Sequence, residues 1–168
     1  ARAAFEKALS LQPTFLPAVV NLVRIDLAEK HPEDAKKRFE AVIAKDPKLV
    51  PAYLGLAELQ AATGSPASDV EATLKRAVAV GPNTTAPKLA LARFYLRTNE
   101  AKKALTLAQE VQASAPADPA AVEMLGRTQI VTGDPQQGLA SLNKLVSLQP
   151  QSPAPLIELA DAQVLTKD

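Results

Sequence analysis

Apolar residues recur every three or four positions along most of the chain, and turn-forming residues interrupt them regularly. This spacing is typical of one face of an amphipathic helix. Between residues 119 and 150, two such runs flank a short turn. In that turn Gly133 suits the left-handed conformation just past a helix end, Asp134 suits an N-cap, and Pro135 suits the first helical position. The stretch therefore predicts a helix, a turn and a second helix.

Prolines mark the length of this unit. Five of them lie 34, 35, 34 and 34 residues apart: Pro13, Pro47, Pro82, Pro116 and Pro150. A fixed period of this length is typical of stacked helical repeats. The single longer spacing places its extra residue near Gly64–Asp69, in the turn between two helices, where an insertion on the surface costs little.

The segment before each of these prolines repeats a triplet of apolar or small residues, which predicts the packing face of the second helix in each pair. The triplets are Ala1, Phe5 and Ala8; Ala35, Phe39 and Val42; Val70, Leu74 and Ala77; Ala104, Ala108 and Val111; and Gly138, Leu142 and Leu145. The first helices carry a matching seam, for example Val122, Leu125 and Gly126, repeated near the end of the chain as Leu156, Leu159 and Ala160.

This pattern resembles the tetratricopeptide repeat. Leu125-Gly126 matches its Leu-Gly pair, Tyr95 its tyrosine, and Ala35 with Phe39 its Ala-Phe pair. The resemblance implies an all-α, right-handed superhelical solenoid of antiparallel helix pairs. We expect a lone second helix at 1–13, a lone first helix at 151–168, and between them the full repeats 14–47, 48–82, 83–116 and 117–150. We also expect the chain to be a fragment of a longer array that can associate with itself end to end.

The resemblance also implies where a partner binds. In the tetratricopeptide family, residues at set positions of each first helix line a concave wall. The equivalent residues here are Val20, Arg24, Leu27, Leu54, Glu58, Leu89, Arg93, Leu96, Arg97, Glu123, Arg127 and Ile130. Such a wall is apolar with a line of arginines interrupted by Glu58. It could hold an extended or helical peptide, with acidic groups or a carboxylate on the arginines. For each residue the alternative is that it only completes the packing between repeats.

Composition limits the other classes of function. The chain has 19 basic and 18 acidic residues, for a net charge of +1, and no cysteine. We therefore predict no nucleic-acid partner, and disulfides and thiolate metal sites are excluded. No apolar run reaches the roughly 18–20 residues that a membrane-spanning helix needs. We expect no membrane contact by this segment, although a lipid anchor upstream is compatible with it.

No catalytic or cofactor motif is present, so we predict no enzyme activity, no cofactor and no metal. The single histidine, His31, is expected to be an exposed turn residue. The alternative, a metal ligand or general base, lacks a second His or Cys that would complete such a site. Glu158 and Asp161 share a helix face and are expected to be solvated rather than a catalytic pair. The basic runs at 36–38, 75–76 and 102–103 are expected to point outward into solvent, with a nucleic-acid stripe as the alternative.

The amino-acid sequence of the repeats also resembles one particular group within this family. LTLAQEVQASAPADPAAVEMLGRTQIVTGD and AKKRFEAVIAKDPKLVPAYLGLAEL look like the tetratricopeptide lipoprotein of the exosortase (PEP-CTERM) sorting system. This resemblance implies a periplasmic or envelope location. It also implies a non-catalytic scaffold for envelope assembly, exopolysaccharide export or protein sorting. The alternative is an accessory, spacer or regulatory segment of a larger enzyme or polysaccharide-synthesis complex.

Overall fold

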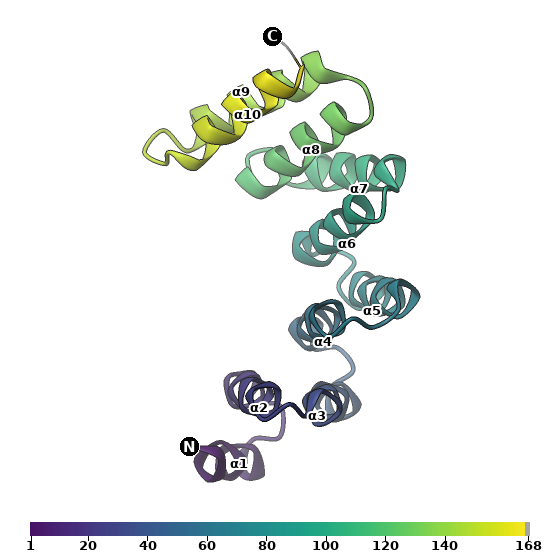
Figure 1. The fold of residues 1–168 in the computed structure, drawn as a ribbon, viewed down its shortest axis with the longest axis vertical. Coiled ribbons are helices and arrows are strands. Elements are labelled where there is room, and N and C mark those ends of the chain that lie inside the picture. The colour runs from purple at the N-terminus through teal and green to yellow at the C-terminus, as the bar shows by residue number, and fades with distance from the viewer. Residues whose placement is uncertain (167–168) are drawn as a thin grey trace. The chain divides into compact units, whose positions relative to one another are not determined.

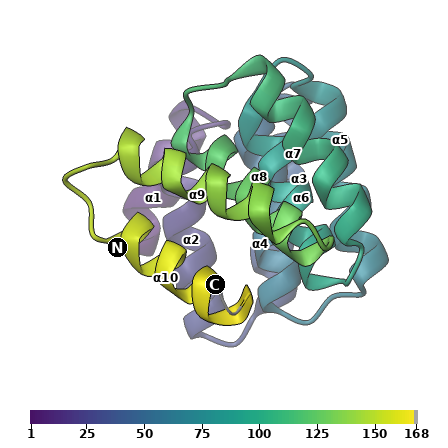
Figure 2. The same cartoon turned by 90° about the horizontal axis from the view of Figure 1, so that it is seen from above.

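The computed structural model describes residues 1–166, and these residues form helices and turns with no strand (Figures 1 and 2). In chain order the helices are α1 (Arg2–Leu11), α2 (Leu16–Ala28), α3 (Pro32–Lys45), α4 (Val50–Ala62), α5 (Ala67–Val80), α6 (Thr85–Arg97), α7 (Ala101–Ser114), α8 (Pro119–Val131), α9 (Pro135–Leu148) and α10 (Ala154–Thr166). The even-numbered helices are the first helices of the predicted pairs, and the odd-numbered helices are the second. The all-α fold is confirmed.

The helix ends follow from the turn residues. Asp134 caps α9 by accepting a hydrogen bond from the backbone N–H of Gln137 at 3.2 Å, and Pro135 opens that helix. Asp118 caps α8 in the same way, by accepting from the backbone N–H of Ala120 at 2.9 Å. Pro13, Pro47, Pro82, Pro116 and Pro150 all lie in the turns that follow second helices. The periodic prolines therefore separate one helix pair from the next.

The turns inside the pairs share one backbone feature. Each contains a residue with positive φ at the equivalent place: Lys30 (64°), Gly64 (76°), Asn99 (60°) and Gly133 (93°). Only two of the four are glycine. The turn therefore requires the left-handed backbone conformation even at Lys30 and Asn99, where a side chain disfavours it. The turn at 63–66, between α4 and α5, is one residue longer than those at 29–31, 98–100 and 132–134. The extra residue lies where the proline spacing placed it.

The chain divides into two compact units, Ala1–Pro87 and Lys88–Asp168, with the boundary inside α6. In the first unit, α2 packs against both α1 and α3, and α4 packs against α3 and α5 (Figure 1). Its core joins the predicted triplet Ala35, Phe39 and Val42 of α3 to buried residues of the first helices, among them Tyr53 and Leu56 of α4. No one pair encloses this core, because each repeat buries its apolar face against its neighbours.

In the second unit α8 packs against α7 and α9, and α9 packs against α10. Val122 lies in one buried cluster with Leu139, Leu142 and Leu145. The two helices of this pair approach closely at their glycines, because a methyl group added to Gly138 would lie 2.8 Å from the backbone oxygen of Gly126.

The predicted triplets are buried in α3, α5, α7 and α9, as expected. Other seam positions differ from expectation. In the first triplet Ala1 is exposed and Phe5 and Ala8 are half-buried. Leu125 is half-buried at the edge of the α8 seam, and in the last seam Leu156 and Ala160 are exposed.

Candidate functional site

The predicted partner-binding residues fall into three classes of exposure. Exposed are Val20, Arg24, Leu27, Glu58, Arg93, Arg97 and Arg127; half-buried are Leu54, Leu96, Glu123 and Ile130; buried is Leu89. Leu89 is only 5% exposed, so its side chain serves packing and offers a partner no surface. Leu54 packs against the core of the first unit, and Ile130 packs against the cluster around Leu142. These three residues therefore take part in the packing of the helices, as the alternative interpretation proposed.

In the first unit, α2 presents an exposed apolar strip with one free cation. Val20 and Leu27 are each more than a third exposed, and Arg24 lies between them on the same helix. Among the described residues, none forms a hydrogen bond or ion pair with Arg24 or with Glu58, its equivalent on α4. This surface combines apolar contact area with unpaired charges of both signs.

In the second unit, α6 carries two unpaired arginines. Arg93 and Arg97 are exposed and four residues apart, so they lie one turn apart on the same helical face. No described side chain is bonded to either of them. A guanidinium with no internal partner keeps all its N–H donors for a carboxylate from outside.

Arg127 differs from these arginines, because it has ion-pair partners within the chain. Its Nη2 lies 3.0 Å from Glu123 Oε1, and its Nε donates to Glu158 Oε1. The hydrogen bond to Glu158 is the main reason that the pKa of Arg127 is raised above its usual value. Arg127 therefore joins α8 to α10. Its charge is already compensated, and Glu158 is an ion-pair partner rather than simply a solvated carboxylate.

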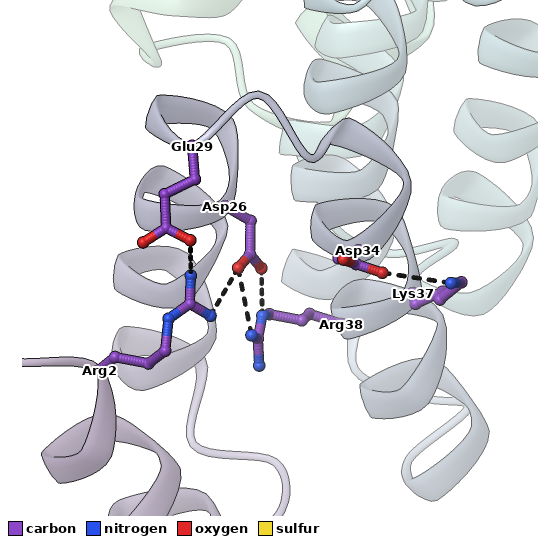
Figure 3. A network of polar contacts seen from close by, with 6 residues as sticks. All are labelled: Arg2, Asp26, Glu29, Asp34, Lys37 and Arg38. Atoms are coloured by element: carbon purple, nitrogen blue, oxygen red, sulfur yellow. Dashed lines mark hydrogen bonds and ion pairs between the residues drawn. The ribbon is translucent and has the colours of Figure 1, made fainter.

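A polar network that the sequence pattern did not predict lies where α1, α2 and α3 meet (Figure 3). Asp26 is only 2% exposed. Its carboxylate accepts from Arg2 Nη1 at 2.7 Å, and from Nε and Nη2 of Arg38, the latter at 3.2 Å. Arg2 also donates to Glu29 at 2.8 Å. The network thus links three successive helices through one buried carboxylate.

The network contains two positive groups, Arg2 and Arg38, and two negative groups, Asp26 and Glu29. The hydrogen bond from Arg38 is the largest cause lowering the pKa of Asp26; burial opposes it, and the bond from Arg2 adds to it. The signal that could have revealed the network is spacing. Asp26 lies three residues after Val23 and four after Leu22, on the buried seam of α2, where an unpaired carboxylate would be very costly.

Asp26 is one of a series of polar residues at equivalent places in the first helices. Gln60 and Gln129 occupy this position in α4 and α8, and both are buried. Gln129 donates to Gln137 at 3.1 Å and accepts from Ser141 at 2.8 Å, both on α9. The repeats therefore share a buried polar position but fill it with different partners.

Several residues of the basic runs have partners within the chain. Lys37 pairs with Asp34 at 3.2 Å and Lys75 with Glu71 at 2.8 Å, while the Arg76 guanidinium lies 5.1 Å from the centre of the Tyr53 ring. Arg38 is the exception to the predicted outward direction, because it turns toward the buried Asp26. Lys37 and Lys75 therefore lie beside carboxylates of their own helices.

His31 is exposed in the turn before α3. Within the described part of the chain, no three His, Asp or Glu side chains gather closely enough to hold a metal ion. None of the described helices is long and apolar enough to span a bilayer.

Two family models match the chain, both described as tetratricopeptide repeat, over residues 1–48 and 89–153. A search of curated proteins finds no match.

Solved structures share the fold. The thermophilic tetratricopeptide protein TTC0263 of Thermus thermophilus is 21% identical, with 97% of this chain and 89% of that chain covered and a TM-score of 0.76. The putative kinesin light chain repeats of Podosopora anserina are 21% identical, with 92% of this chain and 88% of that chain covered and a TM-score of 0.72. YrrB, described as having an unusual peptide-binding site, is 15% identical. The match covers 99% of this chain and 86% of that chain, with a TM-score of 0.67. The two family models, together with the 34-residue period and the buried triplets, show that the chain belongs to the tetratricopeptide repeat family.

Proposed function

We propose that the chain is a binding scaffold whose first helices hold a segment of a partner protein that carries acidic groups. Members of the tetratricopeptide family are generally non-catalytic scaffolds for protein partners. The observation that supports an acidic partner is the contrast between arginines at equivalent positions. Arg24 and Arg93 are exposed and unpaired, whereas Arg127 is neutralised by Glu123 and Glu158.

The mode of binding follows from the surroundings of these arginines. Exposed Val20 and Leu27 flank Arg24, and half-buried Leu96 lies beside Arg97. Apolar side chains of the partner lie on the aliphatic residues, while its carboxylates receive paired hydrogen bonds from the guanidinium groups. Bidentate pairing favours arginine over lysine at such places.

A peptide library displayed on phage tests this proposal. Peptides selected on the chain should combine apolar and acidic residues, and an Arg93→Glu/Arg97→Glu variant should lose them. The matched control is Lys45→Glu/Lys102→Glu, which makes the same total change of charge at two exposed positions of second helices. Selected peptides that are basic, or binding that survives in the Arg93→Glu/Arg97→Glu variant, would rule out the proposal. Circular dichroism establishes that both variants keep their helices.

We further propose a role in the bacterial cell envelope, in assembly, exopolysaccharide export or protein sorting, with a periplasmic location. This proposal is supported by the resemblance between the amino-acid sequence of the repeats and that of the tetratricopeptide lipoprotein of the exosortase system. Fractionation of the source cells with an antibody against the chain is the test. Recovery in the periplasmic or membrane fraction supports the role, and recovery with cytoplasmic markers contradicts it.

A further inference from the structure

A groove of about 450 Å³ lies between α3, α4 and α5, within the first unit. The middle helix, α4, packs against both of the others. All three helices contribute side chains to the lining, among them Ile43 of α3, Leu56 and Gln60 of α4, and Thr73 and Arg76 of α5.

This groove is separate from the surface that the first helices present. On α4 that surface carries the exposed Glu58, whereas Gln60 lines the groove. Two residues along an α-helix correspond to a rotation of about 200°, so Glu58 and Gln60 lie on nearly opposite sides of α4. A partner in the groove therefore contacts residues that the proposed function does not use.

The side-chain amide of Gln60 has no partner inside the chain. Gln60 is only 6% exposed, and its Oε1 is buried without a hydrogen bond. No described residue forms a hydrogen bond with its amide nitrogen either. A buried amide in this state is unfavourable, because it has given up hydrogen bonds to water and gained none from the protein. Gln60 therefore marks a place where a ligand can supply the missing bonds.

The equivalent positions in two other helix pairs show what is missing. There the polar residue of the first helix is bonded by the residue that precedes the bulky member of the second-helix triplet: Arg38 donates to Asp26, and Ser141 donates to Gln129 at 2.8 Å. The corresponding residue of α5 is Thr73, which is also buried. Within residues 1–166, however, nothing is hydrogen-bonded to the Thr73 hydroxyl. The polar position is thus closed in those pairs and open between α4 and α5.

The same groove carries an uncompensated positive charge. Arg76 is exposed, and its guanidinium lies 5.1 Å from the centre of the Tyr53 ring. No described carboxylate pairs with Arg76, whereas Lys36, which also lines the groove, lies 4.0 Å from Glu40. A guanidinium over an aromatic ring keeps the N–H groups at its edge for a carboxylate. The charge of the groove therefore favours an acidic ligand.

We propose that this groove binds an extended segment of a partner protein in which an acidic residue lies close to an apolar one. A backbone group of the segment is hydrogen-bonded to the Gln60 amide, and its carboxylate is bound by Arg76. Its apolar side chain lies on Ile43 and Leu56. The segment is extended because a helix already uses its backbone N–H and C=O groups internally, whereas an extended chain offers them to a partner.

The melting temperature of the free chain gives the first test. Gln60→Met replaces an unpartnered amide by an apolar side chain of similar length, so the melting temperature should stay equal or rise. The matched control is Gln129→Met, which leaves Gln137 and Ser141 without their partner and should lower the melting temperature. A fall in Gln60→Met would show that its amide is already satisfied in the free chain and would overturn the proposal.

A random peptide library displayed on phage supplies the probe for binding. It is selected on an Arg24→Gln/Arg93→Gln/Arg97→Gln variant, which lacks the unpaired arginines of the first helices. Success or failure of this selection is therefore independent of the function proposed above. The selected peptides should combine acidic and apolar residues. If none is selected, the groove binds no such segment and the proposal fails.

Calorimetry with a selected peptide locates the site. Its affinity should fall about tenfold in Gln60→Met and in Arg76→Gln, because each removes one hydrogen-bonding group from the groove. The matched control is Lys75→Gln, which removes the same charge from the neighbouring residue, a partner of Glu71, and should leave the affinity unchanged. A peptide that binds Gln60→Met as tightly as the native chain would contradict the assigned site.

Ester analogues of the selected peptide test the backbone contact. An ester in place of a peptide bond removes the N–H donor and weakens the C=O acceptor, so it detects a hydrogen bond of either kind. One analogue in the series should bind the native chain about five- to tenfold more weakly than the parent peptide and bind Gln60→Met equally well. If every ester acts alike on both proteins, Gln60 does not hold the peptide backbone and the proposal is overturned.

Discussion

Asp26 and Arg38 lie on the two helices of one pair, and the Arg38 guanidinium donates two hydrogen bonds to the buried Asp26 carboxylate. Arg2, from the preceding helix, donates to the same carboxylate. One side chain therefore fixes both the contact within the repeat and the contact between repeats.

Replacing Asp26 with Asn should destabilise the first unit by about 3–5 kcal/mol, because Arg38 then loses its charged partner beside a buried position and Arg2 keeps only Glu29. Urea unfolding at constant ionic strength measures the free energy of unfolding. The control is Asp34→Asn, which removes an exposed pair with Lys37 and should cost less than about 1 kcal/mol. Equal losses in the two variants would show that the Asp26 network adds no more than a surface pair.

The contribution of Asp26 should depend on pH. Its pKa in the folded protein lies below the ordinary value of 3.8, so the ionised form stabilises the fold. This stability is complete above the pKa of the unfolded chain and is lost as the pH falls through the pKa of the folded state. The difference in unfolding free energy between the native chain and Asp26→Asn should therefore be largest near neutral pH and shrink below pH 3.8. A difference that stays constant down to acid pH would contradict the assigned ion pairs.

Leu142→Ala should cost about 2–5 kcal/mol, because Leu142 is fully buried between α8 and α9 and its removal leaves a cavity. Leu125→Ala should cost less, since Leu125 is half-buried and water can fill part of the space. Thermal and urea unfolding of the two variants measure the order. A larger loss for Leu125→Ala would mean that the α8 seam carries more of the packing than the exposures indicate.

Lys30→Gly should stabilise the chain by about 0.5–1 kcal/mol, because Lys30 holds a left-handed conformation that its Cβ disfavours. Asn99→Gly should gain less, since asparagine tolerates this region better than lysine. Melting temperatures of the two variants measure the difference. His31→Gly, at the next residue, where φ is −114°, is the control and should bring no gain.

Arg127→Glu should destabilise the second unit, because it places a third carboxylate beside Glu123 and Glu158. The loss should be largest at low ionic strength and should shrink as salt screens the repulsion. Adding Glu158→Arg should recover much of the loss by reversing the pair. Arg93→Glu, which disturbs no internal pair, should leave the melting temperature nearly unchanged; a large fall there would make Arg93 structural.

Periodicity alone predicted the helices, the turns and most of the core, because a stacked repeat imposes the same spacing on every unit. Val122 and Leu142 are buried because the period brings them to adjacent helices. Periodicity could not predict the pairing of charges, since that depends on which side chains meet between repeats. Arg127 and Arg93 are equivalent in the repeat, but only Arg127 finds glutamates near it, on its own helix and on α10.

The polar seam position also escaped prediction for a physical reason. Asp26, Gln60 and Gln129 are equivalent, and a polar residue on an apolar seam is favourable only when a particular partner reaches it. Arg2 and Arg38 are that partner for Asp26, and they lie 24 and 12 residues away along the chain. Which partner reaches the carboxylate is decided by tertiary packing.

The carboxylate shared by Arg2 and Arg38 has a consequence for the inheritance of repeats. If a whole unit is removed, the constant period keeps the remaining helices in phase. Loss of residues 14–47 would join α1 to α4 and bring Arg2 opposite Gln60, an uncharged side chain. The shortened chain would keep its helices but lose the ion pair at the new junction, so α1 and the repeat 14–47 should be retained together.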